Sequence, residues 1–227
     1  MRSYNLLIKI FMAVLVLVIF WQISNLWKSA TPEKSELEKL IEKQQIQPVV
    51  VTVFYEALCP DSRSFIKHQL KPTFDKIEDY IDVNLIPYGK AETIVTSDDY
   101  EFKCQHGETE CEANMIHACA IHKVLNSRRR LELVECMISN NMHPQAILET
   151  CAKGMDELKD IVQCSKSMEG RKMLKRFGDL TKSLDPRVSF IPTITLDHEI
   201  DNQILILKNL LRQVCQRLDS PPSECKS

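Results

Sequence analysis

The sequence has no marked excess of charge of either sign, no internal repeat and no low-complexity stretch. Its 227 residues include 29 Lys and Arg against 31 Asp and Glu, which gives a net charge of −2 at pH 7. Nucleic-acid-binding domains usually carry a clear basic excess, so the charge gives this function no support. The one basic cluster, Arg128–Arg130, is interpreted as a solvated turn, with an acidic partner as the alternative.

The chain also lacks an N-glycosylation sequon and has little tryptophan. Asn126 and Ser127 are followed by Arg128, where a sequon needs Ser or Thr. The only two tryptophans, Trp21 and Trp27, lie at the end of an apolar N-terminal segment. Aromatic residues of this kind often mark the interface between a membrane and water.

The N-terminal segment has the pattern of a secretory signal. Arg2 and Lys9 precede an apolar run over residues 10–21, as in the charged and apolar regions of signal peptides. We predict that residues 1–30 are a signal peptide or an uncleaved signal-anchor. In the anchor alternative, residues 6–27 would hold the chain as a single-pass type II membrane protein.

Both forms of this signal place the folded part of the chain in a lumenal or extracellular space. Ala30 is a possible cleavage residue, although Lys28 occupies a place where a small residue is preferred. Residues 31–47 are predicted to be a polar spacer and residues 48–218 a single domain, followed by a C-terminal tail over 219–227.

Cys59 lies at the junction of a predicted strand and a predicted helix. The apolar run over residues 48–55 predicts a strand, and Cys59-Pro60-Asp61-Ser62 follows it. Unpaired backbone N–H groups and the helix dipole stabilise a thiolate at a helix start. We therefore predict that Cys59 is a nucleophile, although a buried structural cysteine is the alternative.

The helix after Cys59 is predicted from the spacing of its apolar residues. These side chains, expected to face a sheet, are Phe65, Ile66, Leu70, Phe74 and Ile77. Pro72 lies within the pattern and is expected to kink the helix. Thioredoxin-like redox proteins place a cysteine at such a strand-to-helix junction, usually as Cys-x-x-Cys, whereas here the second position is Ser62.

The order of the remaining elements agrees with a thioredoxin-like α/β fold. Residues 81–86 and 193–196 predict strands, with a short edge strand near Glu199. The intervening chain has helical patterns and no strand-like run over residues 111–180, so we predict a helical insertion of three to five helices over about 104–180. The last helix is predicted over Gln203 to Arg217.

Pro192 directly precedes the predicted strand over residues 193–196. Thioredoxin-like folds have a cis-proline at this place beside the reactive cysteine, and we expect a cis Ile191–Pro192 bond. The backbone of Ile191 would then bind the extended chain of a substrate.

Nine cysteines are a high number for this length, and a secretory chain can keep them as disulfides. Leaving out Cys59, eight remain that can form four bridges with 105 possible connectivities. These structural disulfide candidates are Cys104, Cys111, Cys119, Cys136, Cys151, Cys164, Cys215 and Cys225.

Residues 104–119 combine three of these cysteines with a glycine and the start of a helix. We predict a disulfide-stapled loop. Zinc bound with His106, His117 and His122 is the alternative, but the spacings lack the paired C-x2–4-C pattern of common structural zinc sites. We predict no metal site and no cofactor.

This segment resembles the signature of the gamma-interferon-inducible lysosomal thiol reductase family, C-Q-H-G-x-x-E-C-x-x-N-x-x-x-x-C. All eight fixed positions match: Cys104, Gln105, His106, Gly107, Glu110, Cys111, Asn114 and Cys119. With the Cys59 motif and Pro192, the resemblance covers residues 48–218, and among the family members it is closest in type to the invertebrate ones.

The resemblance implies a thioredoxin-like fold with a helical insertion and reduction of protein disulfides in lysosomal compartments, with a link to antibacterial defence in invertebrates. It implies Cys59 as nucleophile and Ser62 at the place of the second active-site cysteine. This chain departs from the family in that serine, and without a sequon it cannot use glycan-based lysosomal sorting, which favours secretion or membrane anchoring.

The sequence therefore predicts a thiol–disulfide oxidoreductase that reduces or isomerises protein disulfides. Its catalytic residues are predicted to be Cys59, Ser62 and Pro192, with Ile191 binding substrate. A hydrogen bond from Ser62 to the sulfur is expected to help, and an external small thiol would release the product. The alternative is a non-catalytic, disulfide-stabilised binding protein. His106 is expected to be a loop hydrogen-bonder rather than a base.

Overall fold

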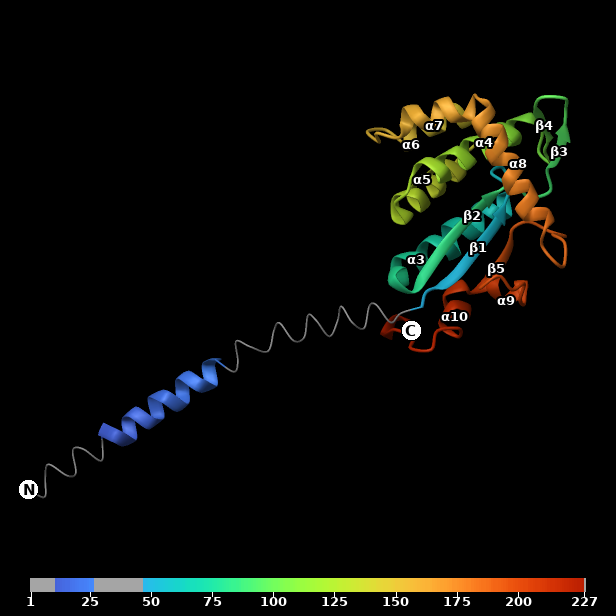
Figure 1. Cartoon of the computed structure of the whole chain (residues 1–227). Coiled ribbons are helices and arrows are strands. Elements are labelled where there is room, and N and C mark those ends of the chain that lie inside the picture. The colour runs from blue at the N-terminus through green and yellow to red at the C-terminus, as the bar shows by residue number, and fades with distance from the viewer. Residues whose placement is uncertain (1–10, 27–46, 227) are drawn as a thin grey trace, which may run out of the picture. The chain divides into compact units, whose positions relative to one another are not determined.

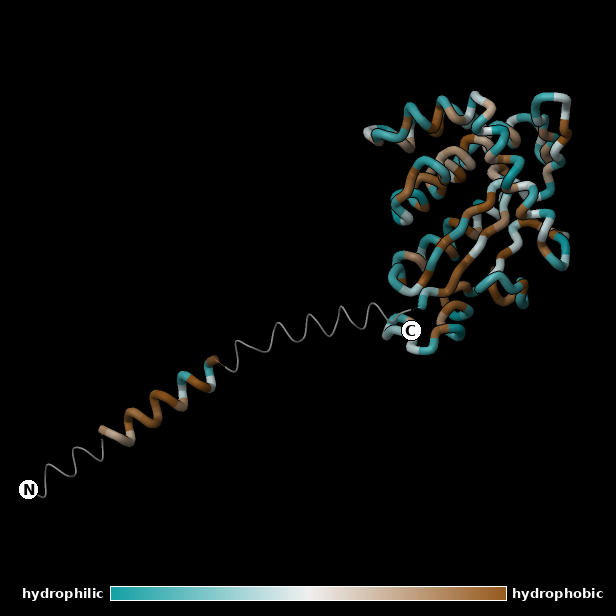
Figure 2. The backbone as a smooth tube through the Cα atoms, in the orientation of Figure 1, coloured by the Kyte–Doolittle hydropathy of each residue, from teal (hydrophilic) through white to brown (hydrophobic). Residues whose placement is uncertain are grey.

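The computed structural model describes residues 11–26 and 47–226. Residues 11–26 form a largely hydrophobic helix (Figure 2) and belong to a different compact unit from the one that begins at Gln47. In these two described ranges no helix is both long and apolar enough to cross a membrane. The anchor predicted through residues 6–27 lies only partly within these ranges, and the predicted spacer, up to residue 46, lies outside the described residues.

A three-stranded sheet forms the centre of the second unit (Figure 1). Strand β1 (Val49–Tyr55) lies between β2 (Ile81–Pro87), which runs parallel to it, and the antiparallel β5 (Thr193–Leu196). These are the three strands that the apolar runs predict. The expected edge strand near Glu199 is only an isolated bridge between Leu196 and Glu199.

The helix after Cys59 is interrupted. It begins as α2 (Pro60–Phe65), continues as a π-helical turn η1 (Ile66–Leu70) and resumes as α3 (Lys71–Ile77) before a 3-10 turn η2 (Glu78–Tyr80). Pro72 has no N–H and its ring crowds the preceding turn. It stands in the first turn of α3, so the π-helical turn accommodates the proline where the sequence predicts a kink.

The five apolar residues expected on this helix are all buried and share one core with β1 and β2. The last helical segments, α9 (Gln203–Lys208) and α10 (Leu210–Cys215), contribute Ile206, Leu210 and Val214 to the same core. The sequence predicts one helix here, but Asn209 divides it. Its backbone leaves the helical conformation (φ −153°) and its side chain caps α10 by accepting a hydrogen bond from Arg212 N at 3.0 Å.

The helical insertion contains five helices, gathered in one block in Figure 1. They are α4 (Glu108–Lys123), α5 (Ser127–Ser139), α6 (Pro144–Cys151), α7 (Leu158–Ser165) and α8 (Met168–Lys182). The basic cluster Arg128–Arg130 begins α5 and is not the solvated turn that the sequence predicts. Arg128 pairs with Asp75 at 3.0 Å and also with Glu78 on the neighbouring helix.

A two-stranded hairpin that the sequence analysis missed precedes the insertion. Strands β3 (Glu92–Val95) and β4 (Tyr100–Lys103) pair with each other and not with the central sheet. The hairpin leads directly into the segment that holds Cys104. A final 3-10 turn, η3 (Ser223–Lys226), lies in the predicted C-terminal tail and is fixed to α10 by the Cys215–Cys225 disulfide.

Candidate active site

Cys59 is the only one of the nine cysteines that is free. Strand β1 ends at Tyr55, three residues form a turn, and Cys59 stands at the N-cap position of α2 with an extended backbone. The other eight cysteines form four disulfides: Cys104–Cys111, Cys119–Cys164, Cys136–Cys151 and Cys215–Cys225. The zinc alternative is therefore wrong, because Cys104 and Cys111 are bonded to each other and Cys119 is bonded to Cys164, which leaves none of the three as a thiolate ligand.

Ile191 and Pro192 lie beside Cys59 although 132 residues separate the sequence positions. The Ile191–Pro192 bond is cis, as expected, and the Cys59 sulfur is 3.9 Å from the carbonyl oxygen of Ile191. A pocket of about 310 Å³, lined by Asp61, Phe190 and Pro192 among others, opens next to this pair. Cys59 itself is buried, and the pocket lies against Ile191 and Pro192 rather than against its sulfur.

Ser62 is fully buried and has a partner different from the one expected. Its hydroxyl oxygen accepts a hydrogen bond from the backbone N–H of Glu56 at 3.3 Å. From within α2, the Ser62 side chain therefore fixes the backbone of Glu56, where the turn before Cys59 begins. The sequence predicts a hydrogen bond from the Ser62 hydroxyl to the Cys59 sulfur, but in the structure this hydroxyl bonds to Glu56 N instead.

The turn before Cys59 is clamped by two asparagines of the helical insertion. Asn114 accepts a hydrogen bond from Ala57 N at 2.8 Å, and the amide of Asn141 donates to Ala57 O at 3.3 Å. Both asparagines are buried. Because both backbone polar groups of Ala57 are satisfied by side chains, the insertion fixes the path of the chain into Cys59.

The amide nitrogen of Asn141 also contacts a buried histidine, His117, and this histidine is neutral. Its Nε2 is 3.1 Å from the Asn141 amide nitrogen and its Nδ1 is 2.9 Å from the Tyr55 hydroxyl. Since the amide nitrogen can only donate, Nε2 must accept and Nδ1–H donates to Tyr55. Burial lowers the pKa of His117 to about 3 and raises the pKa of Tyr55.

Glu56 connects the other end of the turn to the stapled loop. Its carboxylate accepts a hydrogen bond from Lys90 N at 2.7 Å and lies 3.6 Å from His106 Nδ1, which is 2.5 Å from Glu110. Burial raises the pKa of Glu56, opposed mainly by the hydrogen bond from Lys90. His106 thus has the loop role that the sequence favours.

The same three side chains are the one group of ionisable residues, within the described ranges, that has the spacing of a metal site. The ligand atoms of Glu56, His106 and Glu110 lie within 4.8 Å of one another. Hydrogen bonds within the cluster and to backbone groups already occupy these atoms. The geometry therefore supports a polar lock between the loop and the turn.

The sequence analysis missed most of this supporting network. Glu56, Asn141 and Tyr55 carry no local signal, since their partners lie in distant segments. Asn114 belongs to the matched signature, although without an assigned role, and His117 was considered only as a zinc ligand. For Asn114 and His117, the signal that could have identified them is their place among the apolar residues on one face of the predicted helix that became α4.

Comparison with solved structures supports the fold. Oxidised BdbD from Bacillus subtilis superimposes with a TM-score of 0.54 and 12% sequence identity, covering 79% of this chain and 89% of that chain. DsbA from Chlamydia trachomatis gives a TM-score of 0.53 with 14% identity, covering 75% and 88%. The chain therefore has the thioredoxin-like fold of the DsbA type.

Comparison with protein sequences gives the family. The family model described as gamma interferon inducible lysosomal thiol reductase matches residues 50–155. A gamma-interferon-inducible lysosomal thiol reductase-like protein from Anopheles gambiae is 31% identical over 192 residues, covering 78% of this chain and 80% of that protein. The GILT-like protein C02D5.2 from Caenorhabditis elegans is 32% identical over 187 residues, covering 81% and 57%.

The gamma-interferon-inducible lysosomal thiol reductase of Carassius auratus is 32% identical over 177 residues, covering 76% of this chain and 70% of that protein. Family and fold together support thiol–disulfide oxidoreductase chemistry. This chain belongs to the gamma interferon inducible lysosomal thiol reductase family.

Proposed function

We propose that the protein reduces or isomerises disulfides of protein substrates with Cys59 as its only nucleophile. The observation that carries this proposal is the position of Cys59: a free thiol at a helix start, 3.9 Å from the carbonyl oxygen of Ile191 and beside the cis-proline Pro192. The substrate's backbone would pair with Ile191, which presents its disulfide to the Cys59 sulfur.

The first step is attack of the Cys59 thiolate on one sulfur of the substrate disulfide. A mixed disulfide forms, and the second substrate sulfur leaves as a thiolate that takes a proton from solvent. Cys59 stands at the N-cap of α2, where the first backbone N–H groups have no partner within the helix. The clamp on Ala57 and the lock at Glu56 keep the nucleophile in place during this step.

Ser62 cannot carry out the second step, because a hydroxyl does not displace a thiolate from a disulfide. An external small thiol attacks the Cys59 sulfur, releases the second substrate thiol and leaves a mixed disulfide between Cys59 and the small thiol. A second small-thiol molecule then regenerates Cys59 and carries away the oxidised pair. In isomerisation, another thiol of the substrate attacks instead.

The place of action is proposed as the secretory pathway, in the endosomal or lysosomal lumen or outside the cell, with a role in host defence. The lysosomal location is supported by the names of two relatives, a lysosomal thiol reductase-like protein and a lysosomal thiol reductase. Four disulfides agree with an oxidising compartment.

A second candidate function is a binding protein that captures disulfide-containing partners without turnover. The observation in its favour is Ser62, which is buried and hydrogen-bonded to Glu56 as a purely structural residue would be. Capture and catalysis share the first step and differ in release.

The test compares wild type with Ser62→Cys on a stoichiometric protein disulfide, in the presence and absence of glutathione. Wild type should hold the substrate as a covalent adduct at Cys59 until glutathione is added. Ser62→Cys should release reduced substrate without glutathione and end with a disulfide between residues 59 and 62. Ser62→Ala, as the matched control, should behave as wild type.

Two results would overturn the proposal. If wild type releases substrate equally well without glutathione, another cysteine resolves the adduct. If wild type forms the adduct but glutathione fails to release reduced substrate, the binding protein is the better description.

A further inference from the structure

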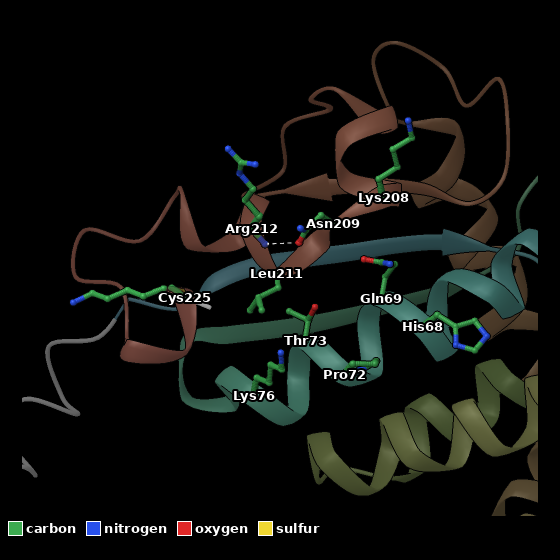
Figure 3. A pocket seen from close by; sticks show the side chains of 11 residues that line it. His68, Gln69, Pro72, Thr73, Lys76, Lys208, Asn209, Leu211, Arg212 and Cys225 are labelled. Atoms are coloured by element: carbon green, nitrogen blue, oxygen red, sulfur yellow. Dashed lines mark hydrogen bonds between the residues drawn. The ribbon is translucent and has the colours of Figure 1, made fainter.

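A groove lined by basic residues lies between the helix that follows Cys59 and the C-terminal helical segments. It has a volume of about 590 Å³. Its walls come from η1 and α3 on one side and from α9, α10 and η3 on the other, as Figure 3 shows. The residues that line it are His68, Gln69, Pro72, Thr73, Lys76, Lys208, Asn209, Leu211, Arg212, Cys225 and Lys226.

The charge of this lining has one sign. Four of the eleven residues are Lys or Arg, a fifth is histidine, and none is Asp or Glu. The protein as a whole has a net charge of −2, so the groove does not simply reflect a basic surface. Lys76, Lys208, Arg212 and Lys226 are all exposed.

Two acidic residues near the groove, Asp75 on α3 and Glu78 in η2, are paired with residues that do not line it. Asp75 pairs with Lys71 at 2.6 Å and with Arg128 at 3.0 Å, and Glu78 pairs with Arg128. Lys76, between them in sequence, forms no ion pair in the part of the chain that the structure describes. Its positive charge is therefore available to a ligand.

The two walls of the groove are fixed to each other. Gln69 accepts a hydrogen bond from Leu210 N at 3.1 Å, which ties η1 to the start of α10. The Cys215–Cys225 disulfide fixes the tail to α10 and so holds Lys226 at the groove. In Figure 3, Lys76 extends from α3 toward α10, whereas the side chains of Lys208 and Arg212 extend from α9 and α10 away from Lys76.

The groove adjoins the pocket that lies beside Ile191 and Pro192. His68 and Gln69 line both it and the pocket that contains Ile191 and Pro192. His68 lies nine residues after Cys59, about 13 Å along a helix, and Lys76 about 25 Å. An extended chain covers this span in roughly four to eight residues.

We infer that this groove binds an acidic, extended segment of the protein substrate, four to eight residues from the disulfide that Cys59 attacks. The inference rests on the proposed function and adds a substrate class to it. Asp and Glu side chains of the segment would pair with Lys76, Lys208, Arg212 and Lys226, while the cysteine lies at Pro192. Exposed ion pairs of this kind are individually weak, so the preference depends on several of them together.

The test measures formation of the first covalent adduct, which needs no turnover. Each of two peptides carries one cysteine activated as a mixed disulfide with 2-thiopyridine. One peptide has three Glu, and the other three Gln, at four to eight residues from this cysteine, and both are made with these residues before or after it. Attack of the Cys59 thiolate on the peptide sulfur expels thiopyridone, whose absorbance gives the rate. The full chain is used, at 20 mM and at 500 mM NaCl.

The Glu peptide should react about 5- to 30-fold faster than the Gln peptide at low salt, as expected for about three exposed ion pairs. Most of this advantage should be lost at high salt, because salt screens exposed charges. The variant Lys76→Gln, Lys208→Gln, Arg212→Gln keeps only Lys226 of the four cations and should lose most of the difference in rate between the two peptides. The control variant Lys153→Gln, Lys159→Gln, Lys172→Gln removes the same charge outside the groove and should retain the advantage.

The outcomes separate the inference from the proposed function. Equal rates for the two peptides in wild type, or loss of the advantage in the control variant as well, would overturn the acidic-segment inference and leave Cys59 as nucleophile. If neither peptide releases thiopyridone, while free cysteine added to the same peptides does release it, the proposed function itself fails. Binding of anionic phospholipid vesicles to the groove in place of the Glu peptide would refute the acidic-segment inference and leave the proposed function standing.

Discussion

The burial of His117 makes a quantitative prediction about stability in acid. Its pKa in the folded state is lowered from 6.5 to about 3 by burial. In the unfolded chain the imidazole takes up a proton below about pH 6.5, whereas the folded chain does not until about pH 3. The free energy of unfolding must therefore fall as the pH decreases through this window, because the unfolded state binds more protons.

The size of this effect at pH 5 is about 2 kcal/mol, obtained from a tenfold change in proton occupancy per pH unit and 1.36 kcal/mol per tenfold change. His117 stays neutral in the folded protein at pH 5. The figure is set by the titration of the unfolded chain.

Protonation of His117 in the folded protein is opposed by its neighbours as well as by burial. Nε2 accepts from the Asn141 amide, which also donates to Ala57 O. A second proton on the ring would place two N–H groups against each other. Relief would require the Asn141 amide to turn, which would release the carbonyl of Ala57 beside the active-site turn.

The perturbation is His117→Gln, assayed by urea unfolding at pH 7.5 and pH 5.0. The variant should be less stable than wild type at pH 7.5, because a buried, hydrogen-bonded side chain is replaced. Between the two pH values, however, it should lose about 2 kcal/mol less than wild type. His143→Gln, which changes an exposed histidine, should lose as much as wild type.

The reasoning is refuted if wild type and His117→Gln lose the same free energy between pH 7.5 and pH 5.0. Should the variant fail to fold, the ring signals of His117 in wild type give a second test by NMR. They should not titrate between pH 8 and pH 4, and a midpoint near 6.5 would contradict the buried neutral state.

Two further predictions concern the framework of the site. Replacing Cys119 and Cys164 with Ala opens a loop of 45 residues and should lower the free energy of unfolding by about 4 kcal/mol in the chain-entropy account. The same replacement of Cys215 and Cys225 opens a loop of 10 residues and should lower it by about 2.7 kcal/mol. Equal losses in urea unfolding would contradict this difference. Asn141→Ala removes the donor to Ala57 O and should cost about 1–3 kcal/mol and slow the formation of the Cys59 adduct, whereas Asn140→Ala, at the end of α5, should leave adduct formation unchanged.

The features that could be predicted from the sequence are those encoded locally or by order along the chain. Cys59 follows a buried strand and begins a helix, so its place was evident from neighbouring residues. Pro192 was identified because it precedes the strand that must return to β1. The pairing of the remaining cysteines could not be predicted, because spacing does not say which helices of the insertion lie together.

Other features depend on contacts between distant segments. The clamp on Ala57 joins a turn at the end of β1 to Asn114 and Asn141, and no residue next to Ala57 indicates it.

The β3–β4 hairpin did have a local signal, since short apolar alternations flank Ser97-Asp98-Asp99. The break at Asn209 depends on its side chain capping a new helix, which competes with the continuous apolar pattern of the last helix.

The two ends of the turn before Cys59 are anchored by groups with opposite responses to acid. His117, behind Ala57, costs stability as the pH falls, since its folded-state pKa is lowered. Glu56, at the other end, has a raised pKa. Its contribution is fully present below its ordinary pKa of about 4.5 and is lost as the pH rises through the raised value.

Acidification thus weakens one anchor of the turn and favours the other. The Cys119–Cys164 bridge further fixes α4, which carries Asn114 and His117, to α7, and this covalent link does not titrate. The proposed action in an acidic lumen requires Cys59 to stay in place where carboxylates and histidines change charge. Two buried groups with opposite responses to acid and a disulfide that does not titrate hold the turn before Cys59.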